Sequence, residues 1–397
     1  MTAYLDHAAT TPMLPDALAA MTEQLGVVGN ASSLHRTGRA ARRVIEESRE
    51  RIARAVGARP SEVVFTSGGT ESDNLALKGT YRARREADPG RVRLVVGATE
   101  HHAVLDSVEY LVAHEGATVT WVEPTPDGLV EPAAVRAAIE HDPDTVALVS
   151  VMWANNEVGV VQDVAAVAEA AHEHGSIPTH TDAVQAVGHV PVDFTASGVD
   201  LMTITGHKLG GPIGVGALVA RRDARLLPLT HGGGQERRMR SGTLDTPAIA
   251  GLAVAVEESV ATIPTEAPRV AALRDELITR ARAIEPDIRV GGRWDVGDTT
   301  GRLPGNAHLI VPGCDGDSLL YLLDAAGIAC STGSACQAGV PRPSHVLLAM
   351  GVPESDARGA LRLTLGHTST HADVEAFLAA LPAAIDRARR ARVATAS

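Results

Sequence analysis

The chain has 397 residues, which is more than one hydrophobic core of ordinary size needs, so we expect two domains in one globular body. Hydrophobic residues make up 45% and charged residues 21%, a balance that excludes a disordered or fibrous protein. The formal net charge of −12 disfavours a nucleic-acid partner, because phosphate binding needs a basic surface. Neither an apolar run of about 18 residues nor a leader pattern occurs, so we expect a soluble, cytoplasmic protein without membrane contact.

The N-terminal part of the chain is expected to be irregular and then helical. Pro12 and Pro15 precede a helix that should begin near Asp16. A second, longer helix is expected over residues 35–56, where Ala, Val and Ile recur at helical spacing between charged residues.

Short strand-like segments then alternate with helical stretches. The expected strands are residues 62–66, 94–96, 119–122, 146–150, 178–181, 201–205 and 215–219. This alternation predicts an α/β protein with a mostly parallel seven-stranded sheet and helices on both faces. Ligands on such sheets bind at the carboxyl ends of the strands, so the polar residues that follow the strands are the candidate site residues.

The alternation loosens after residue 258, and the Pro- and Thr-rich segment 263–268 resembles a hinge into a smaller α+β domain. The elements expected there are a helix at 270–284, strands at 307–311 and 361–365, and a last helix that starts at Thr370 and bends at Pro382. We therefore divide the chain into residues 1–15, which would pack with the small domain, a large domain at 16–258 and a small domain at 259–397.

The strand at 201–205 is followed by Gly206, His207 and Lys208, and then by more small residues. A lysine delivered by an apolar strand into a glycine-rich turn can lose its charge through desolvation, and a neutral amine can form a Schiff base with a carbonyl cofactor. An ordinary surface lysine is the simpler interpretation when Lys208 is taken alone.

Ser67, Gly68 and Gly69 link an expected strand to a helix in which Thr70 to Asp73 form a capping-box pattern. Free N–H groups at a helix N-terminus suit a phosphate. An ordinary strand-to-helix connection explains the same residues equally well.

Polar clusters follow four of the expected strands. They occupy residues 99–102, 153–157, 181–185 and 205–208. Any one of them has an ordinary explanation as a helix cap or turn. Four clusters at equivalent ends of one sheet favour a shared site.

Six motifs together resemble the class V aminotransferase family, and more narrowly its cysteine desulfurases of the iron–sulfur-cluster-assembly type. They lie at residues 4–11, 65–74, 155–159, 206–208, 239–243 and 334–336. The resemblance implies fold type I with pyridoxal 5'-phosphate (PLP) as the cofactor. It also makes Lys208 the Schiff-base lysine and places Asp182 at the pyridine nitrogen, keeping it protonated so that the ring can withdraw electrons.

Other ring contacts are implied in the same way. Gln185 would lie near the ring hydroxyl, and His101 would stack on the ring and move protons. This chain has His102 where the family often has lysine, so either imidazole could be the stacking group, and position favours His101.

The resemblance also implies a phosphate site and a dimer. Gly69, Thr70, Thr205 and His207 would hold the phosphate, and Thr243 would reach the phosphate of the neighbouring subunit of a homodimer.

Substrate contacts are implied for Arg362, whose guanidinium would pair with a carboxylate, and for Asn156, which would contact cofactor and substrate alike. Asn30 is a weaker candidate for the substrate. Ala31 stands where the family usually has proline, which leaves the shape of that loop open.

The three cysteines are too few for a disulfide framework. Cys336 lies among small residues in a segment with loop character, as a mobile thiol requires. Cys330 ends an apolar run and is expected to be buried, whereas Cys314 lies in a turn that an exposed thiol could occupy and is the one competitor to Cys336. The resemblance implies that Cys336 takes sulfur from L-cysteine as a persulfide, leaves alanine, and passes the sulfur to an iron–sulfur scaffold or another acceptor, for cluster assembly or tRNA thiolation. No resident metal is predicted.

Two alternatives remain at this point. A selenocysteine lyase or another class V aminotransferase would also keep Lys208 and Asp182, although a plain aminotransferase has no use for Cys336. A nucleotide-binding scaffold on a doubly wound sheet is disfavoured, because neither a Gly-x-Gly-x-x-Gly nor a Gly-Lys-Ser/Thr motif follows a strand.

Overall fold

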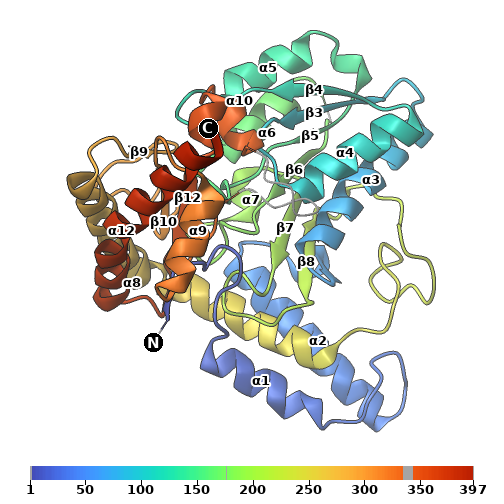
Figure 1. The fold of residues 1–397 in the computed structure, drawn as a ribbon. Helices are drawn as coiled ribbons and strands as arrows, with labels where there is room; N and C mark the ends of the chain where they lie inside the picture. Colours follow the sequence, from blue (N-terminus) through green and yellow to red (C-terminus); the bar gives the residue numbers. More distant parts are fainter. Residues whose placement is uncertain (1, 176, 334–342, 397) are drawn as a thin grey trace.

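The computed structural model describes residues 2–175, 177–333 and 343–396. Its centre is a seven-stranded sheet in the order β2-β8-β7-β6-β5-β3-β4 (Figure 1). The strands are β2 (Val63–Thr66), β3 (Arg93–Gly97), β4 (Thr118–Val122), β5 (Val146–Ser150), β6 (Thr179–Asp182), β7 (Leu201–Thr205) and β8 (Gly216–Ala220). Each agrees with a strand expected from the sequence to within two residues.

The sheet is mostly parallel, as expected. Neighbouring strands pair in parallel from β7 across to β4, and β8 alone runs antiparallel to both of its neighbours, β7 and β2. All strands except the edge strand β4 are buried throughout, because helices cover both faces.

Two groups of helices cover the two faces. On one face α3 and α4 pack on side chains such as Val64 and Leu148, and on the other α2, α6, α7 and α8 pack on side chains such as Phe65 and Ile204. The helices of this part are α1 (Pro15–Leu25), α2 (Arg36–Ala55), α3 (Gly69–Ala87), α4 (His102–Glu115), α5 (Pro132–Glu140), α6 (Val164–His172), α7 (Phe194–Ser197) and α8 (Thr246–Ile284), with 3-10 turns at Pro60–Glu62 and Pro143–Thr145.

A second, smaller core surrounds an antiparallel sheet in the order β12-β10-β9, and it includes Ala3 and Leu5 from the N-terminal segment. Its elements are β9 (Arg289–Val290), β10 (Asn306–Ile310), β12 (Ala360–Thr364), α9 (Gly316–Ala325), α10 (His345–Ala349), α11 (Glu354–Ala357) and α12 (His371–Ala396), together with the parallel pair β1 (Ala3–Tyr4) and β11 (Ile328–Ala329). The N-terminal segment thus lies with the small core.

The expected hinge at 263–268 is wrong, because this segment lies inside α8, a continuous helix of 39 residues that contains Pro264 and Pro268. Its N-terminal half contributes to the core of the large sheet and its C-terminal half to the small core, so packing on both sides outweighs the helix-breaking tendency of proline. By length and composition α8 is also apolar enough to cross a membrane, but these contacts make it a core helix.

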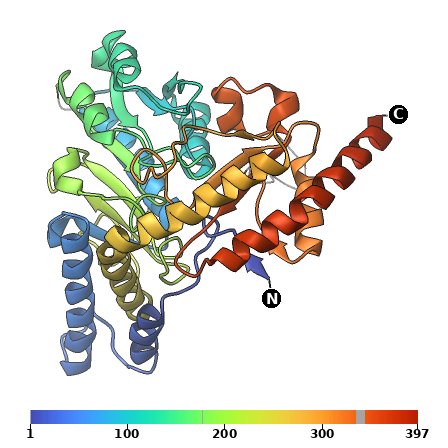
Figure 2. The same cartoon turned by 90° about the vertical axis from the view of Figure 1, so that its left-hand side faces the viewer.

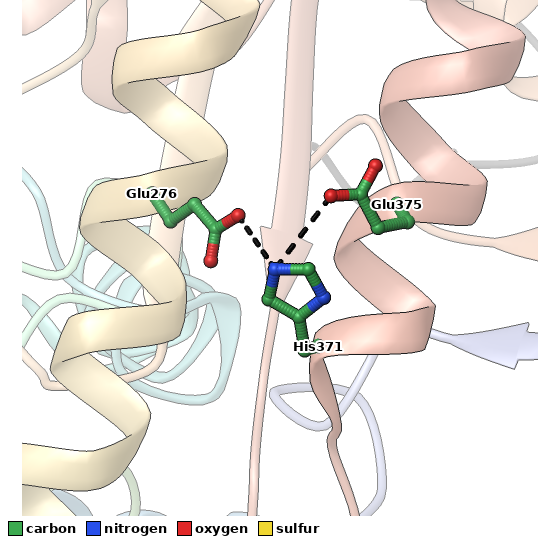
Figure 3. Close-up of side chains that lie close together, drawn as sticks. All are labelled: Glu276, His371 and Glu375. Atoms are coloured by element: carbon green, nitrogen blue, oxygen red, sulfur yellow. Dashed lines mark ion pairs between the residues drawn. The ribbon is translucent and has the colours of Figure 1, made fainter.

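Ion pairs join α8 to α12, which lies alongside it (Figure 2). Figure 3 shows His371 between Glu276 and Glu375, with Nε2 at 2.9 and 3.6 Å from their carboxylate oxygens. These three side chains are close enough to hold a cation. Arg280, however, donates to both carboxylates, at 2.7 Å to Glu276, so its guanidinium already supplies the positive charge.

A buried ion pair holds the start of residues 236–243, the segment that ends at Thr243. Arg49 of α2 donates from two nitrogens to the two carboxylate oxygens of Glu236, both at 2.8 Å. The backbone N–H of Phe65 donates to the same carboxylate at 2.9 Å. Glu236 therefore connects the segment to α2 and β2.

We predict that Glu236→Gln lowers the free energy of unfolding by about 3–5 kcal/mol, because it leaves the buried Arg49 charge without its carboxylate. Urea unfolding followed by circular dichroism measures the change. The matched control is Glu47→Gln, which breaks the exposed pair with Arg43 and should change stability by about 0.5 kcal/mol or less. Equal effects of the two substitutions would contradict the prediction.

Candidate active site

A cavity of about 370 Å³ opens where the carboxyl ends of the parallel strands face the small domain. The four polar clusters expected from the sequence meet there. Ten of the predicted site residues line it, namely Gly69, Thr70, His101, Asn156, Asp182, Gln185, Thr205, His207, Lys208 and Arg362. The N-terminal segment adds Ala8 and Ala9, and the small domain adds Ser331, Gly333 and His345.

Lys208 lies three residues beyond the end of β7, and its amine points at the N-terminal segment. Nζ donates to the carbonyl oxygens of Ala8 at 2.5 Å and Ala9 at 2.8 Å. Burial, and then the neighbouring Arg362 charge, lower the pKa of Lys208 to about 8. A pKa of about 8 leaves roughly a tenth of the amine neutral and nucleophilic at pH 7.

The chain contains only two lysines, Lys78 and Lys208. Lys78 lies on α3, where Nζ donates to Asn74 at 2.7 Å and lies over the Tyr110 ring. Lys208 is therefore the one lysine that lines the cavity. The scarcity of lysine is visible in the sequence alone and singles out Lys208 further.

Asp182 ends β6, and its carboxylate is buried in the wall of the cavity. Oδ1 accepts a hydrogen bond from the backbone N–H of Val184 at 2.8 Å. Burial, and then the Asp73 charge, raise the pKa of Asp182 to about 8. Burying an ionised carboxylate without a cationic partner is unfavourable. Asp182 is therefore suited to a ligand that brings a positive charge to the cavity wall.

The N-terminus of α3 provides an anion cradle. Gly68 precedes the helix with φ of 148°, a conformation that favours glycine, and a Cβ on Gly69 would lie 2.9 Å from a Val184 methyl. The expected capping box is wrong: the cap is Gly68, and Glu71 accepts from the Ser67 N–H while pairing with Arg240. Within the described part of the chain no side chain caps this end, so its N–H groups stay available to the cavity that Gly69 and Thr70 line.

His101 and His102 both line the cavity. Although part of the His101 ring is exposed to the cavity, desolvation, and then Lys208, lower its pKa to about 4. Its Nδ1 accepts from the Ala103 N–H at 3.1 Å, so a neutral ring carries its proton on Nε2. His102 instead contacts Asp106 at 3.2 Å and lies beside the His345 ring.

Arg362 is buried on β12 and extends from the small domain toward the cavity. Nη1 donates to the carbonyl oxygen of Asn156 and Nη2 to Asp6, both at 3.0 Å, whereas Nε has no hydrogen-bond partner among the described residues. A buried guanidinium with donor capacity left over is suited to binding a carboxylate. Gln185, expected near a ring hydroxyl, donates to the Ala8 carbonyl at 3.0 Å.

Two of the described predicted residues lie elsewhere. Thr243 and Asn30 are exposed and do not line the cavity of their own chain. Cys336 lies outside the described residues. The other two thiols are buried: burial raises the pKa of Cys314, and burial followed by the Asp6 charge raises the pKa of Cys330 to about 12. Neither is poised to be a thiolate at neutral pH.

Four acidic or imidazole groups in or beside the site are not predicted from the sequence as site residues, namely Asp73, Glu100, Glu157 and His345. Asp73 had been assigned to a helix cap. Glu157 accepts a hydrogen bond from Ser344, and His345 Nε2 lies 3.0 Å from the Glu100 carbonyl oxygen. Their positions in the sequence could have indicated them as site residues, because each lies within or next to a strand-end cluster or beside a candidate loop.

The class V aminotransferase model matches residues 3–377. The chain belongs to this family. It is 57% identical over 394 residues to an IscS-like cysteine desulfurase of Mycobacterium tuberculosis (strain ATCC 25618 / H37Rv), covering 99% of each chain. These findings confirm the family that the six motifs indicated.

Solved structures of the family share the fold. A NifS-like protein superposes with a TM-score of 0.87 at 33% identity, covering 98% of this chain and 100% of that one. A structure described as SspA in complex with cysteine superposes with a TM-score of 0.78 at 33% identity, covering 93% and 100%.

We predict that Lys208 reacts with an acylating reagent with a midpoint near pH 8 in protein freed of cofactor, because its lowered pKa makes the neutral amine available there. Peptide mass spectrometry over pH 6–10 measures the labelling of each lysine. Lys78 is the internal control and should require a higher pH, since less of its surface is enclosed. Parallel labelling of both lysines would show that Lys208 is not desolvated.

Proposed function

We propose that this chain is a PLP-dependent cysteine desulfurase, which converts L-cysteine to L-alanine and transfers the sulfur as a persulfide on Cys336. The observation that carries the proposal is that one cavity contains both Lys208, its one lysine, and the buried Asp182 carboxyl group. The names of the similar proteins support it.

The cavity fits PLP. The α3 N-terminus with Thr70, Thr205 and His207 would hold the phosphate, Lys208 would hold the aldehyde carbon, and Asp182 would face the ring nitrogen. When bound, PLP supplies an electron sink for the bonds at the substrate Cα.

Side chains of the cavity provide the remaining functions. Arg362 binds the substrate carboxylate, helped by the neighbouring Asn156, and so fixes the orientation of Cα. Lys208 takes the proton from Cα, since its pKa of about 8 suits a base near neutral pH. His101 stacks on the ring; its pKa of about 4 keeps it neutral, with a proton on Nε2 for the substrate side.

Sulfur transfer falls to Cys336. Its thiolate attacks the substrate sulfur, so that an S–S bond forms while the substrate Cβ–S bond breaks with its electron pair left on the carbon side. Cβ then takes up a proton from solvent, Cα regains the proton held by Lys208, and alanine leaves. The buried, high-pKa states of Cys314 and Cys330 support this assignment by leaving Cys336 as the remaining thiol.

The persulfide then needs an acceptor, which we infer to be an iron–sulfur scaffold or another sulfur-accepting protein in the cytoplasm. We also infer a homodimer in which Thr243 completes the phosphate site of the neighbouring subunit. Its exposed position, outside the cavity of its own chain, supports this role.

A selenocysteine lyase is the second candidate, because Lys208, Asp182 and Arg362 would serve it equally. Another class V aminotransferase would have no use for the Cys336 thiol, whereas a desulfurase needs it. We therefore use Cys336 as the test of the function.

In Cys336→Ser, cofactor binding should survive and alanine release from cysteine should fall to background, because a hydroxyl is a far weaker nucleophile toward sulfur than a thiolate. Cofactor content comes from the visible spectrum, and alanine from amino-acid analysis. Cys314→Ser and Cys330→Ser are matched controls that should keep most of the activity. Mass spectrometry after brief exposure to cysteine should place the extra sulfur on Cys336; finding it on Cys314 would sink the assignment.

Asp182→Asn should retain bound cofactor but lose roughly 10²–10³-fold in kcat, because an amide cannot hold the ring proton as a buried carboxylate does. Steady-state alanine release gives kcat, and the visible spectrum confirms cofactor content. Near-normal turnover would place the ring-facing carboxylate elsewhere.

A further inference from the structure

Residues 6–11 of the N-terminal segment contact the active site at several points. Two of their carbonyl oxygens accept the hydrogen bonds of the Lys208 amine, and one of these also accepts from Gln185 at 3.0 Å. Their one carboxylate, that of Asp6, accepts from Nη2 of Arg362 at 3.0 Å. The geometry of the site therefore depends on where residues 6–11 lie.

The side chain of His7 anchors this segment from behind. It is 3% exposed and does not line the cavity. Its ring lies against residues 366–369, which we call the small-domain turn, and a Cβ added to Gly366 would overlap the imidazole. Nε2 lies 3.3 Å from the hydroxyl oxygen of Thr368 and 3.4 Å from that of Ser369. The ring thus joins the N-terminal segment to the turn that precedes α12.

The partners of the ring determine where its proton lies. Thr11 donates its hydroxyl proton to the His7 carbonyl at 3.1 Å, and its oxygen lies 3.4 Å from Nδ1. That oxygen is left as an acceptor, so Nδ1 carries the proton and Nε2 accepts. Ser369 suits this arrangement, because its Oγ accepts from the Gly366 N–H at 3.0 Å and keeps its own proton for Nε2. Burial lowers the pKa of His7 to about 4, so the ring is neutral at physiological pH.

The backbone of the segment is held in a different way. The His7 N–H donates to the Thr364 carbonyl at 3.3 Å, and the Ala8 N–H donates to the Thr364 hydroxyl at 2.8 Å. Residues 9–11 make no hydrogen bond to the small domain in the part of the chain that the structure describes. The link from Thr11 through the His7 ring to the small-domain turn is therefore what connects them to it.

We propose that His7 is a positioning residue whose ring holds residues 6–11 against the small-domain turn and thereby fixes the carbonyl oxygens that hold the Lys208 amine. With two N–H groups held, the remaining position of the tetrahedral amine has a fixed direction, as proton transfer at the substrate Cα requires. The function of Lys208 as the base rests on the proposed function.

Labelling of cofactor-free protein with an acylating reagent tests the proposal without substrate. His7→Phe keeps an aromatic ring and removes both nitrogens. The labelling midpoint of Lys208 should then rise from near pH 8 toward the ordinary pKa of 10.5, because water reaches the amine once the segment loosens. Peptide mass spectrometry over pH 6–11 measures the midpoint. An unchanged midpoint in His7→Phe would overturn the proposal.

Two further variants separate hydrogen bonding from packing. His7→Asn places an amide N–H where Nδ1 can reach Thr11, so its midpoint should rise less than that of His7→Phe. Equal rises would overturn the role of the hydrogen bonds. Thr11→Val keeps the side-chain shape and removes the Nδ1 partner, so it should raise the midpoint even where His7→Phe fails to fold. No rise in Thr11→Val would overturn the proposal as well.

His367→Phe is the matched control. His367 lies in the same turn with its ring centroid 6.1 Å from that of His7, and among the described residues its side chain makes no hydrogen bond. Its substitution should leave the Lys208 midpoint near that of the wild type. A rise as large as that of His7→Phe would mean that any change at this junction loosens the site, which would overturn a specific role of His7.

Steady-state alanine release from cysteine gives a second readout. In His7→Phe kcat should fall about ten- to a hundredfold, because the base is displaced from its position, and His7→Asn should recover part of the loss. An unchanged kcat in His7→Phe would overturn the proposal. Should the wild-type protein release no alanine, the desulfurase proposal fails, whereas labelling of the cofactor-free protein still decides the role of His7.

Discussion

The carboxyl ends of parallel strands lie at the same edge of a sheet, and the site depends on this constraint. Asp182 ends β6, Lys208 follows β7, and the anion cradle at the start of α3 follows β2. All three strands are buried, so each delivers its polar residues into a desolvated place. Desolvation then changes their chemistry: it lowers the pKa of the amine and raises that of the carboxyl.

Much of this arrangement could be predicted from the sequence, because most of the buried parallel strands are short apolar runs and polar residues follow them directly. Lys208, Asp182 and their neighbours were found in this way. The continuity of α8 could not be predicted, since Pro264 and Pro268 signal a break and only packing on two cores overrides it. Asp73 was missed because one residue type serves both helix caps and buried clusters, and burial decides between them.

Residues from both cores form the site, so its geometry also depends on how the two cores are positioned relative to each other. Arg362 lies on β12 of the small sheet, where it exchanges backbone hydrogen bonds with Ser331, yet its guanidinium contacts Asn156 of the large part. Asp6 of the N-terminal segment holds the same guanidinium. If Arg362 binds the substrate carboxylate as proposed, this binding depends on the alignment of three chain segments that are distant in sequence.

The continuity of helix α8 limits how the two cores can move relative to each other. Any rotation of one core against the other must bend this helix, because the chain passes through both without a loop. Proline cannot donate the helical hydrogen bond, so the carbonyls of Val260 and Pro264 lack their usual partners four residues on. Any bending of α8 is therefore opposed least by helical hydrogen bonds between Val260 and Pro268, although the helix runs through this stretch without a break.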